Sequence, residues 1–384
     1  MPLSVGLIGF GNRALLGTVV DEHPRARVSA VQDPDPAARE RAGLAFPDAL
    51  VTADLDTLLD SGVDAVLVLS PDHTHEEIAI SCLQRGVAVF CEKPLAITTA
   101  GADRILDVAA KTEAPLYVGH NMRHLPMVLT MRELINSGEI GEVEAVWCRH
   151  FVGNGGDYYF KDWHAERRNT TGLLLQKGAH DLDVIHWLAG APSVRVTAIG
   201  KLALYGGLDR TGRSGQRASD VAEPDVWPPS NLANLNPVID VEDISMMLMQ
   251  LGNGVLASYQ QCHFTPDYWR NYTVIGSRGR IENVGDMDDG EVLLWNRRHA
   301  GFAEPDRRVR FRTGAGTHGG ADRSLIDEFI RYVADGAPTA TSPLAARDAV
   351  AAGEAATRSL RSGGIPQDVP AAAPGVQRAF TSRG

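Results

Sequence analysis

The chain has 384 residues, of which 44% are hydrophobic and 22% are charged, a composition typical of globular proteins. Its 37 basic and 48 acidic side chains give a formal net charge of −11, which argues against nucleic acid or an anionic membrane as a partner because both attract basic surfaces. The length exceeds what one hydrophobic core usually organises, so two domains are expected.

The N-terminal segment has the order of a dinucleotide-binding βαβ unit. An apolar run at residues 3–8 leads into Gly9-Phe10-Gly11-Asn12-Arg13-Ala14, and a second apolar run at residues 28–31 is followed by Asp33. In such a unit the first glycine permits a tight turn, the second lets the backbone approach a pyrophosphate, and the alanine keeps the helix close to the sheet. The Asp33 carboxylate would accept hydrogen bonds from the adenosine ribose, which favours NAD over NADP.

Strands and helices alternate up to about residue 120. Apolar runs at residues 65–70, 87–91 and 116–119 predict parallel strands buried on both faces, and residues 75–85 predict a helix. Together these elements predict a doubly wound parallel sheet.

After residue 140 the pattern changes to strand-like runs without intervening helices. We expect a large, mostly antiparallel sheet, with a helix at about residues 174–189 packed against it. Residues 205–238 predict a long loop, and helices at 324–333 and 344–360 precede a Pro/Ala/Gly-rich tail that we expect to be poorly ordered. The strand-like runs are residues 143–151, 194–204, 244–251, 255–264 and 272–275.

The cysteines and the N-terminus indicate a cytoplasmic protein. The four cysteines form no C-x-x-C pair, so reduced thiols are expected. The chain enters a strand directly after Met1-Pro2, which leaves no room for a signal peptide, and no apolar run is long enough to span a membrane. No cluster of His, Cys and carboxylate residues has convincing metal-ligand spacing, so no metal is expected.

Five motifs carry a family resemblance. They are Gly9-Phe10-Gly11-Asn12-Arg13-Ala14, Ser70-Pro71-Asp72-His73-Thr74-His75, Cys91-Glu92-Lys93-Pro94-Leu95, His180-Asp181-Leu182-Asp183 and Gly276-Ser277-Arg278-Gly279-Arg280. With these motifs the chain resembles the Gfo/Idh/MocA oxidoreductases, the glucose-fructose oxidoreductase and inositol dehydrogenase family. The resemblance implies a Rossmann domain, a second α+β domain with an open-faced sheet, a substrate held between them, and a homodimer or homotetramer formed through that sheet.

The expected domains are a Rossmann domain at residues 1–122 and a substrate-binding and oligomerisation domain at residues 123–340. A C-terminal helix and tail at residues 341–384 are expected to follow, with the helix packing back on the Rossmann domain.

The same resemblance assigns roles to individual residues. Lys93 matches the catalytic lysine, and Glu92 and Pro94 would position it and the nicotinamide. His180 matches the histidine of an Asp-x-x-x-His motif, but Gln176 stands at the Asp position with Lys177 beside it. It therefore stays open whether an Asp–His relay operates here. The expected cofactor-binding residues are Gly9, Phe10, Gly11, Asn12, Arg13, Ala14, Asp33, Ser70, Pro71, His75, Glu92, Lys93 and Asn121.

The substrate side is predicted from helix spacing and from aromatic clusters. On a helix, Gln176, His180 and Asp183 share one face, as expected of a helix that lines a wet cleft. Lys177 is a further catalytic candidate, because a nearby cation would lower the pKa of Lys93. Aromatic groups around residues 158–163 and 263–269 suit a sugar ring, and without an Arg/Lys cluster for phosphate a neutral sugar or glycoside is expected. The expected substrate-binding residues are Lys93, Arg123, Trp163, Gln176, Lys177, His180 and Trp269.

The leading hypothesis is an NAD-dependent dehydrogenase that acts on a secondary alcohol of a sugar, polyol or glycoside. Lys93 would be its acid/base, with His180 assisting. One alternative is an enzyme with tightly held NAD that oxidises a glycoside transiently in order to cleave it. Another is a non-catalytic protein of the same fold that senses a cofactor or a sugar.

Overall fold

The computed structural model describes residues 2–314 and 316–381, and its chain divides into two compact units. The first unit comprises Met1–Asn121, Gly316–Val350 and Ala372–Gly384. The second comprises Met122–Ala315 and Ala351–Ala371.

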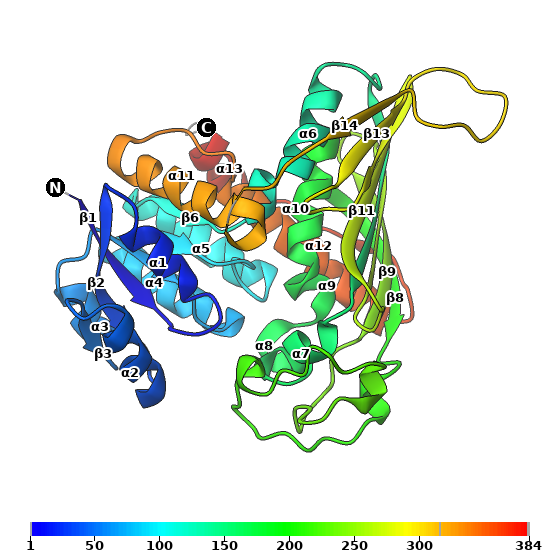
Figure 1. Cartoon of the computed structure of the whole chain (residues 1–384). Coiled ribbons are helices and arrows are strands. Elements are labelled where there is room, and N and C mark those ends of the chain that lie inside the picture. The colour runs from blue at the N-terminus through cyan, green and yellow to red at the C-terminus, as the bar shows by residue number, and fades with distance from the viewer. Residues whose placement is uncertain (1, 315, 382–384) are drawn as a thin grey trace. The chain divides into compact units, whose positions relative to one another are not determined.

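A parallel sheet forms the centre of the first unit (Figure 1). Its strands are ordered β3-β2-β1-β4-β5-β6, and every neighbouring pair is parallel. The predicted doubly wound sheet is therefore confirmed, and its order reverses between β1 and β4, where ligands bind in such folds. The strands are β1 (Leu3–Ile8), β2 (Ala26–Gln32), β3 (Leu50–Thr52), β4 (Ala65–Val68), β5 (Ala88–Cys91) and β6 (Leu116–Val118). The connecting helices are α1 (Leu15–Asp21), α2 (Pro36–Ala45), α3 (Leu55–Asp60), α4 (His75–Gln84) and α5 (Thr99–Thr112).

Helix α11 (Ala321–Asp335) belongs to the first unit, whereas the expected boundaries placed it in the second domain. Its apolar residues Leu325, Ile326 and Phe329 are buried in the same core cluster as the apolar residues of β1. The amphipathic helix therefore completes the Rossmann core from a distant part of the sequence.

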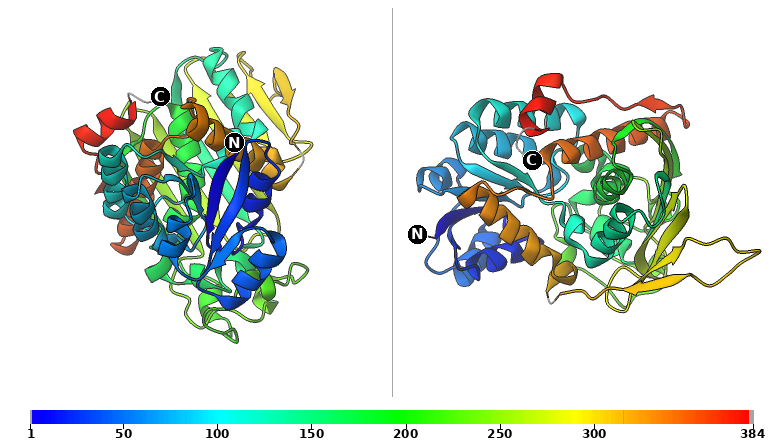
Figure 2. Two further views of the ribbon diagram at one scale, coloured as in Figure 1. Left: turned by 90° about the vertical axis from the view of Figure 1, so that its left-hand side faces the viewer. Right: turned by 90° about the horizontal axis from the view of Figure 1, so that it is seen from above.

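In the C-terminal tail, residues 367–368 and 374–381 form regular elements, whereas a poorly ordered tail was expected. Strand β15 (Gln367–Asp368) pairs with β8 of the second unit through the backbone, and α13 (Pro374–Thr381) packs against α5 (Figure 2). Backbone pairing and one apolar helix face hold this segment despite its Pro/Ala/Gly composition. It follows helix α12 (Pro343–Arg361).

The second unit contains the expected large, mostly antiparallel sheet, with the strand order β14-β13-β12-β11-β7-β10-β9-β8-β15. Strand β10 pairs with β7 in parallel, and the other neighbouring pairs are antiparallel. The strands are β7 (Val143–Val152), β8 (Ser193–Lys201), β9 (Ile244–Leu251), β10 (Leu256–Cys262), β11 (Tyr268–Gly276), β12 (Gly279–Val284), β13 (Glu291–Trp295) and β14 (Arg307–Arg310). Its helices include α6 (Pro126–Asn136), α7 (Gly155–Tyr159), α8 (Arg167–Thr170), α9 (Leu173–Gln176) and α10 (Gly178–Ala189).

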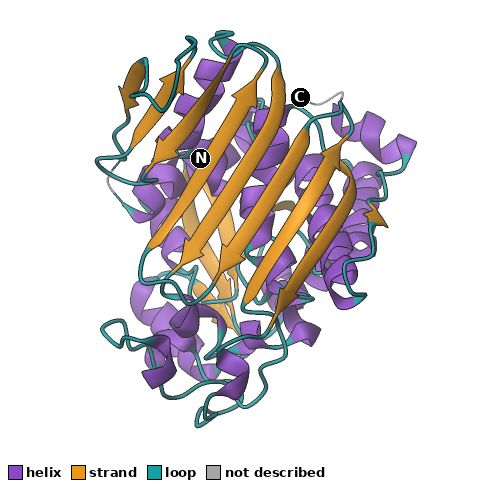
Figure 3. Ribbon diagram, turned by 90° about the vertical axis from the view of Figure 1, so that its right-hand side faces the viewer, coloured by secondary structure: helices purple, strands orange, loops and turns teal. Residues whose placement is uncertain are grey.

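The two faces of this sheet differ. Helix α10 packs against β7 and β10 on one face, which we call the helix side. The other face is not covered by helices of its unit and is called the open face (Figure 3). Because side chains alternate along a strand, the open face presents the exposed residues Trp147, Ile199, Met246, Leu248 and Leu256.

No helix in the described residues is long and apolar enough to cross a membrane. Within the same ranges, no group of three or more His, Cys, Asp or Glu side chains is arranged to hold a metal ion. The four cysteines are free thiols, and Cys82, Cys91 and Cys148 are buried.

Candidate functional site

The glycine-rich turn of the first unit has the geometry of a phosphate-binding turn. Gly9 has a φ of +91°, and a Cβ atom there would lie 2.7 Å from the backbone nitrogen of Ser70, so only glycine fits. A Cβ atom at Gly11 would meet nothing within 4 Å. The backbone at Gly11 therefore borders open space, which is what the approach of a pyrophosphate requires.

Asp33 directly follows β2, and its side chain is hydrogen-bonded to the backbone of the glycine-rich turn. Its carboxylate accepts hydrogen bonds from the backbone N–H of Phe10 at 2.7 Å and of Asp35 at 2.8 Å. The Arg39 side chain donates to the carbonyl oxygens of Asp33 (2.8 Å) and Pro34 (2.9 Å). Arg39 therefore pairs with backbone carbonyl oxygens and not with the Asp33 carboxylate.

Arg13, in the same turn, is clamped by two carboxylates. Its Nε donates to Glu92 at 2.6 Å, and its two terminal nitrogens donate to Asp322 of α11 at 3.1 and 3.0 Å. The side chains of Asn121 (3.0 Å) and His318 (2.8 Å) also donate to Asp322. Burial of Asp322 opposes ionisation, but the hydrogen bonds from His318 and Arg13 outweigh it and lower its pKa. Asp322 was not predicted, and it ties several predicted cofactor residues to α11.

Lys93 directly follows Glu92 at the end of β5, and the Glu92 carboxylate also accepts a hydrogen bond from the Lys93 backbone N–H at 3.0 Å. The peptide bond between Lys93 and Pro94 is cis. The Pro94 carbonyl faces Nδ1 of His75 at 2.8 Å, while Nε2 of His75 faces the Ser70 carbonyl at 2.9 Å.

Because carbonyl oxygens only accept hydrogen bonds, both ring nitrogens of His75 must carry protons to satisfy both contacts. Burial opposes this charge, but the side chains of Cys91 and Asp72 and the Pro94 carbonyl outweigh it and raise the pKa of His75 to about 10. His75 therefore joins the segment after β4 to the segment after β5. In this unit the predicted cofactor residues follow the carboxyl ends of β1, β2, β4, β5 and β6.

The second unit carries the other predicted residues around the junction of α9 and α10. Gln176 ends α9, Lys177 lies between the helices, and His180 lies in the first turn of α10. All three are buried within the chain, as is Asp183, rather than forming the exposed polar stripe that the helix spacing indicated. The helix was predicted correctly, but the packing of α10 against the sheet was underestimated.

Lys177 lies among aromatic side chains. Its ammonium donates to the Tyr268 hydroxyl at 3.3 Å and lies 5.3 Å and 5.5 Å from the ring centres of Tyr159 and Tyr268. Burial opposes the charge, but the two tyrosines outweigh it and raise the pKa of Lys177. The ammonium form is therefore the form present at neutral pH.

On the helix side of the sheet, Asp181 is hydrogen-bonded to four side chains from the strands. Its carboxylate accepts hydrogen bonds from His150 (2.9 Å), Tyr259 (3.0 Å), the Nε of Arg270 (3.1 Å) and the Tyr272 hydroxyl. Burial raises its pKa, but His150 and Arg270 outweigh this and the net pKa is lowered. Arg270, fixed in this way, donates to the Tyr268 hydroxyl at 3.4 Å.

Two predicted substrate residues, Arg123 and Trp163, contact other side chains of the second unit. The Arg123 guanidinium forms a two-pronged ion pair with Asp183, both contacts being 2.7 Å, and lies over the ring of Trp187. The Trp163 ring stacks on His164, with 3.6 Å between their centres. Arg123 therefore anchors its segment to α10, and Trp163 keeps one ring face packed within the chain.

The placement of Trp269 differs from the prediction. Trp269 pairs with Phe151 across β11 and β7, and its ring lies 5.8 Å from that of Phe151 on the open face. Tyr268 and Arg270, its neighbours along β11, point to the helix side, where Lys177 lies. Strand alternation therefore separates Trp269 from the predicted site, and its neighbour Tyr268 lies there instead.

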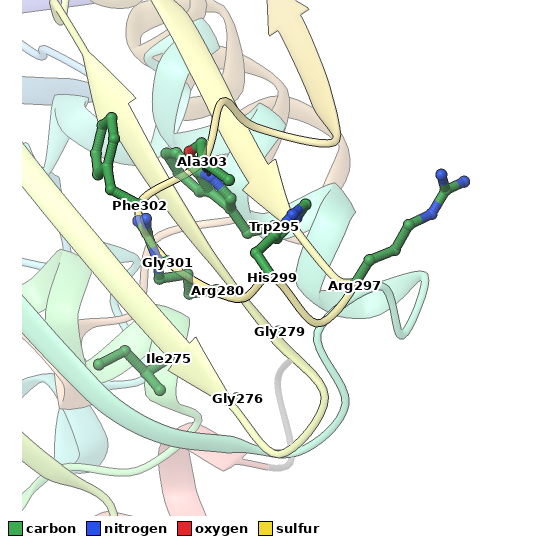
Figure 4. A pocket seen from close by; sticks show the side chains of 10 residues that line it. All are labelled: Ile275, Gly276, Gly279, Arg280, Trp295, Arg297, His299, Gly301, Phe302 and Ala303. Atoms are coloured by element: carbon green, nitrogen blue, oxygen red, sulfur yellow. Dashed lines mark hydrogen bonds between the residues drawn. The ribbon is translucent and has the colours of Figure 1, made fainter.

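A pocket of about 390 Å³ lies at the other end of β11 (Figure 4). Ile275, Arg280, Trp295, His299 and Phe302 are among its lining residues, and the Arg280 guanidinium stacks over the Trp295 ring at 3.5 Å. Ile275 has the same strand parity as Trp269, so the pocket belongs to the open face and contains none of the predicted site residues.

Comparison with known proteins identifies both parts of the chain. Residues 3–120 match the family model described as the NAD-binding Rossmann fold of an oxidoreductase family, and residues 132–369 match the model of its C-terminal alpha/beta domain. The chain is similar to inositol 2-dehydrogenase 1 of Saccharopolyspora erythraea, with 33% identity over 233 residues, which cover 58% of this chain and 62% of that protein. It is also similar to 2,7-anhydro-N-acetylneuraminate hydratase of Mediterraneibacter gnavus, with 34% identity over 199 residues, which cover 51% of each.

The chain thus spans less than two thirds of the length of these relatives. Among solved structures, levoglucosan dehydrogenase in complex with NADH and levoglucosan matches with a TM-score of 0.77. The match covers 96% of this chain and 100% of that chain at 19% identity, which shows a common fold.

Proposed function

Because the chain belongs to the Gfo/Idh/MocA oxidoreductase family, we propose that it transfers a hydride between NAD and a secondary alcohol of a sugar, polyol or glycoside. The observation that supports this proposal is the set of predicted cofactor residues that follow the ends of β1, β4 and β5. Open space beside Gly11 leaves room for a pyrophosphate, and Asp33 lies at the end of β2 where an adenosine ribose would need an acceptor. The names of the relatives, an inositol dehydrogenase and a sugar-acid hydratase, favour a carbohydrate or polyol substrate.

In this proposal the nicotinamide, when bound, accepts or returns the hydride. Lys93 takes the proton of the substrate hydroxyl during oxidation and returns it during reduction, a role typically worth about 10²–10⁴-fold in rate. Glu92 and His75 hold the backbone on either side of Lys93 through their contacts with its N–H and with the Pro94 carbonyl. His180 is proposed to assist, and the neutral amide of Gln176 cannot serve it as a proton acceptor.

The cofactor is proposed to be NAD rather than NADP. A 2′-phosphate needs a cation and is repelled by a carboxylate such as Asp33. The two arginines near the turn are both engaged, Arg13 with Glu92 and Asp322 and Arg39 with backbone carbonyls. Recruiting either of them to a phosphate would break these contacts.

A homo-oligomer formed through the open face is part of the same proposal. Its exposed apolar side chains include Trp147, Ile199 and Leu248, and an apolar patch of this kind on a sheet face typically marks an interface. Sedimentation or size-exclusion with light scattering would report the dimer or tetramer, and Leu248→Lys should dissociate it.

The experiment that tests the function is incubation of the purified protein with NAD and a panel of sugars, polyols, glycosides and sugar acids, followed by NADH absorbance. Formation of NADH with at least one of these substrates supports the proposal. The hydratase relative favours a second candidate, in which the oxidation is transient and no net redox change occurs. That candidate predicts protein-retained NAD and a changed carbohydrate, detected by mass spectrometry, without NADH release.

A further inference from the structure

On the helix side of the second sheet, the two nearby carboxylates lie against Arg270 and not against Lys177. Arg270 pairs with Asp181 at 3.1 Å and lies 3.7 Å from Asp286, so these two carboxylates serve the guanidinium. Burial of Asp286 raises its pKa. Among the described residues no carboxylate lies within ion-pair distance of Lys177, although Lys177 is only 7% exposed.

The Tyr268 hydroxyl accepts hydrogen bonds but donates none to the described residues. It accepts one hydrogen bond from Lys177 and one from Arg270, which occupy the lone pairs of its oxygen. Its own O–H must therefore point away from both cations, and within the described ranges no residue accepts it. Tyr268 is 39% exposed, so a ligand can reach this side chain from solvent.

Nearby positive charge also lowers the pKa values of three neighbouring side chains. Burial favours the neutral forms of His150 and His263, and the nearby positive charges add to it, so the pKa of His150 falls to about 3 and that of His263 falls well below its ordinary value. Burial opposes ionisation of Tyr268, but Arg270 and Lys177 outweigh it and lower its pKa to about 8. The groups around Tyr268 include the cations Lys177 and Arg270, the neutral His150 on β7, the Tyr159 side chain and the Asp286 carboxylate.

We propose that Lys177 and Tyr268 bind a carboxylate group of the substrate, so that the substrate is an acidic sugar or sugar acid. A carboxylate would accept one hydrogen bond from the Lys177 ammonium and one from the Tyr268 hydroxyl, and it would give Lys177 the ion-pair partner that the described residues do not provide. The inference rests on the proposed function and narrows its substrate class. It replaces the neutral sugar expected from the sequence, where a single lysine beside an aromatic group gave no sign of an anion site.

The test compares acidic sugars with their neutral counterparts in the presence of NADH. Isothermal calorimetry would measure binding of glucuronate, galacturonate and mannuronate beside glucose, galactose and mannose, with N-acetylneuraminate as a further acidic probe. Hydrogen bonds to charged groups predict that at least one acidic sugar binds about ten- to a hundredfold more tightly than the neutral sugars. Equal affinities, or no measurable binding of any acidic sugar, would overturn the inference.

Variants attribute the preference to the named residues. Lys177→Met should abolish the acidic preference, Lys177→Arg should retain most of it, and Tyr268→Phe should reduce it while leaving the charge in place. Lys201→Met, which removes an exposed lysine of β8, is the matched control and should keep the preference. A preference that survives in Lys177→Met would refute the assignment. Because binding is measured without turnover, NADH formation from neutral sugars alone would leave the dehydrogenase proposal standing while this inference fails.

Discussion

Replacement of Asp322 by asparagine should damage both the stability of the first unit and its affinity for NAD. Asp322 is 1% exposed and accepts hydrogen bonds from Arg13, Asn121 and His318. Asparagine keeps the shape but removes one of the two buried carboxylate charges, Asp322 and Glu92, that pair with the partly buried Arg13 guanidinium. Breaking a buried ion pair from one side costs about 3 kcal/mol or more. At about 2–4 °C per kcal/mol for a unit of this size, the melting temperature should fall by about 6–12 °C.

The matched control is Asp327→Asn on the same helix. Asp327 is about half exposed and contacts Arg331 and His23 at the surface, so its loss should cost well under about 1 kcal/mol. Differential scanning calorimetry of both variants, with KM for NAD, would measure the difference. If Asp322→Asn melts within the range of Asp327→Asn, the clamp around Arg13 does not stabilise the unit and the reasoning fails.

Asp322 should also make the stability of the first unit fall at acidic pH. Asp322 has a lowered pKa in the folded protein, so its stabilisation is complete above the unfolded value of about 3.9 and is lost as the pH falls below it. Asp322→Asn should therefore flatten the acid side of the stability profile relative to the wild type. An unchanged slope between about pH 4 and pH 2 would contradict the assignment.

Three further predictions concern single positions. Lys93→Met should lower kcat by about 10²–10⁴-fold while NADH still binds, as measured by its fluorescence; near-normal kcat would make Lys93 structural. Asp33→Ser should narrow the ratio of kcat/KM for NAD over NADP, and a wild-type enzyme that prefers NADP would refute the cofactor assignment. Trp269→Ala should leave the substrate KM unchanged because its ring lies on the open face; a large rise in KM would place it in the site after all.

The sequence predicted the elements that depend on local patterns. The glycine-rich turn, the buried parallel strands and Asp33 follow from residue spacing and composition, and all lie where that spacing placed them. Lys93 lies directly after its strand, as the apolar run predicted, whereas its role was implied by the resemblance of the contiguous Glu-Lys-Pro motif to the family. Such features need no knowledge of the distant parts of the chain.

The residues that were missed depend on long-range packing. Asp322 and Asp181 look like ordinary helix residues in the sequence, and only the fold brings Arg13 to one and Arg270 to the other. Trp269 and Tyr268 are adjacent, so the choice between them depended on the side of β11 that α10 covers, which local pattern does not reveal. Strand parity could have shown that the two point to opposite faces, but not which face carries the site.

The central strand of the second sheet also constrains how the chain reaches its fold during synthesis. Strand β7 leaves the ribosome early, yet its register pairs Ala145 with both Leu256 and Ile275. Both edges of β7 therefore stay unpaired until β10 and β11 have been made, and closing loops of this length is slow compared with forming helices. A nascent chain that ends before β10 would expose two strand edges and the apolar residues of β7, which are the features that promote aggregation and recruit chaperones.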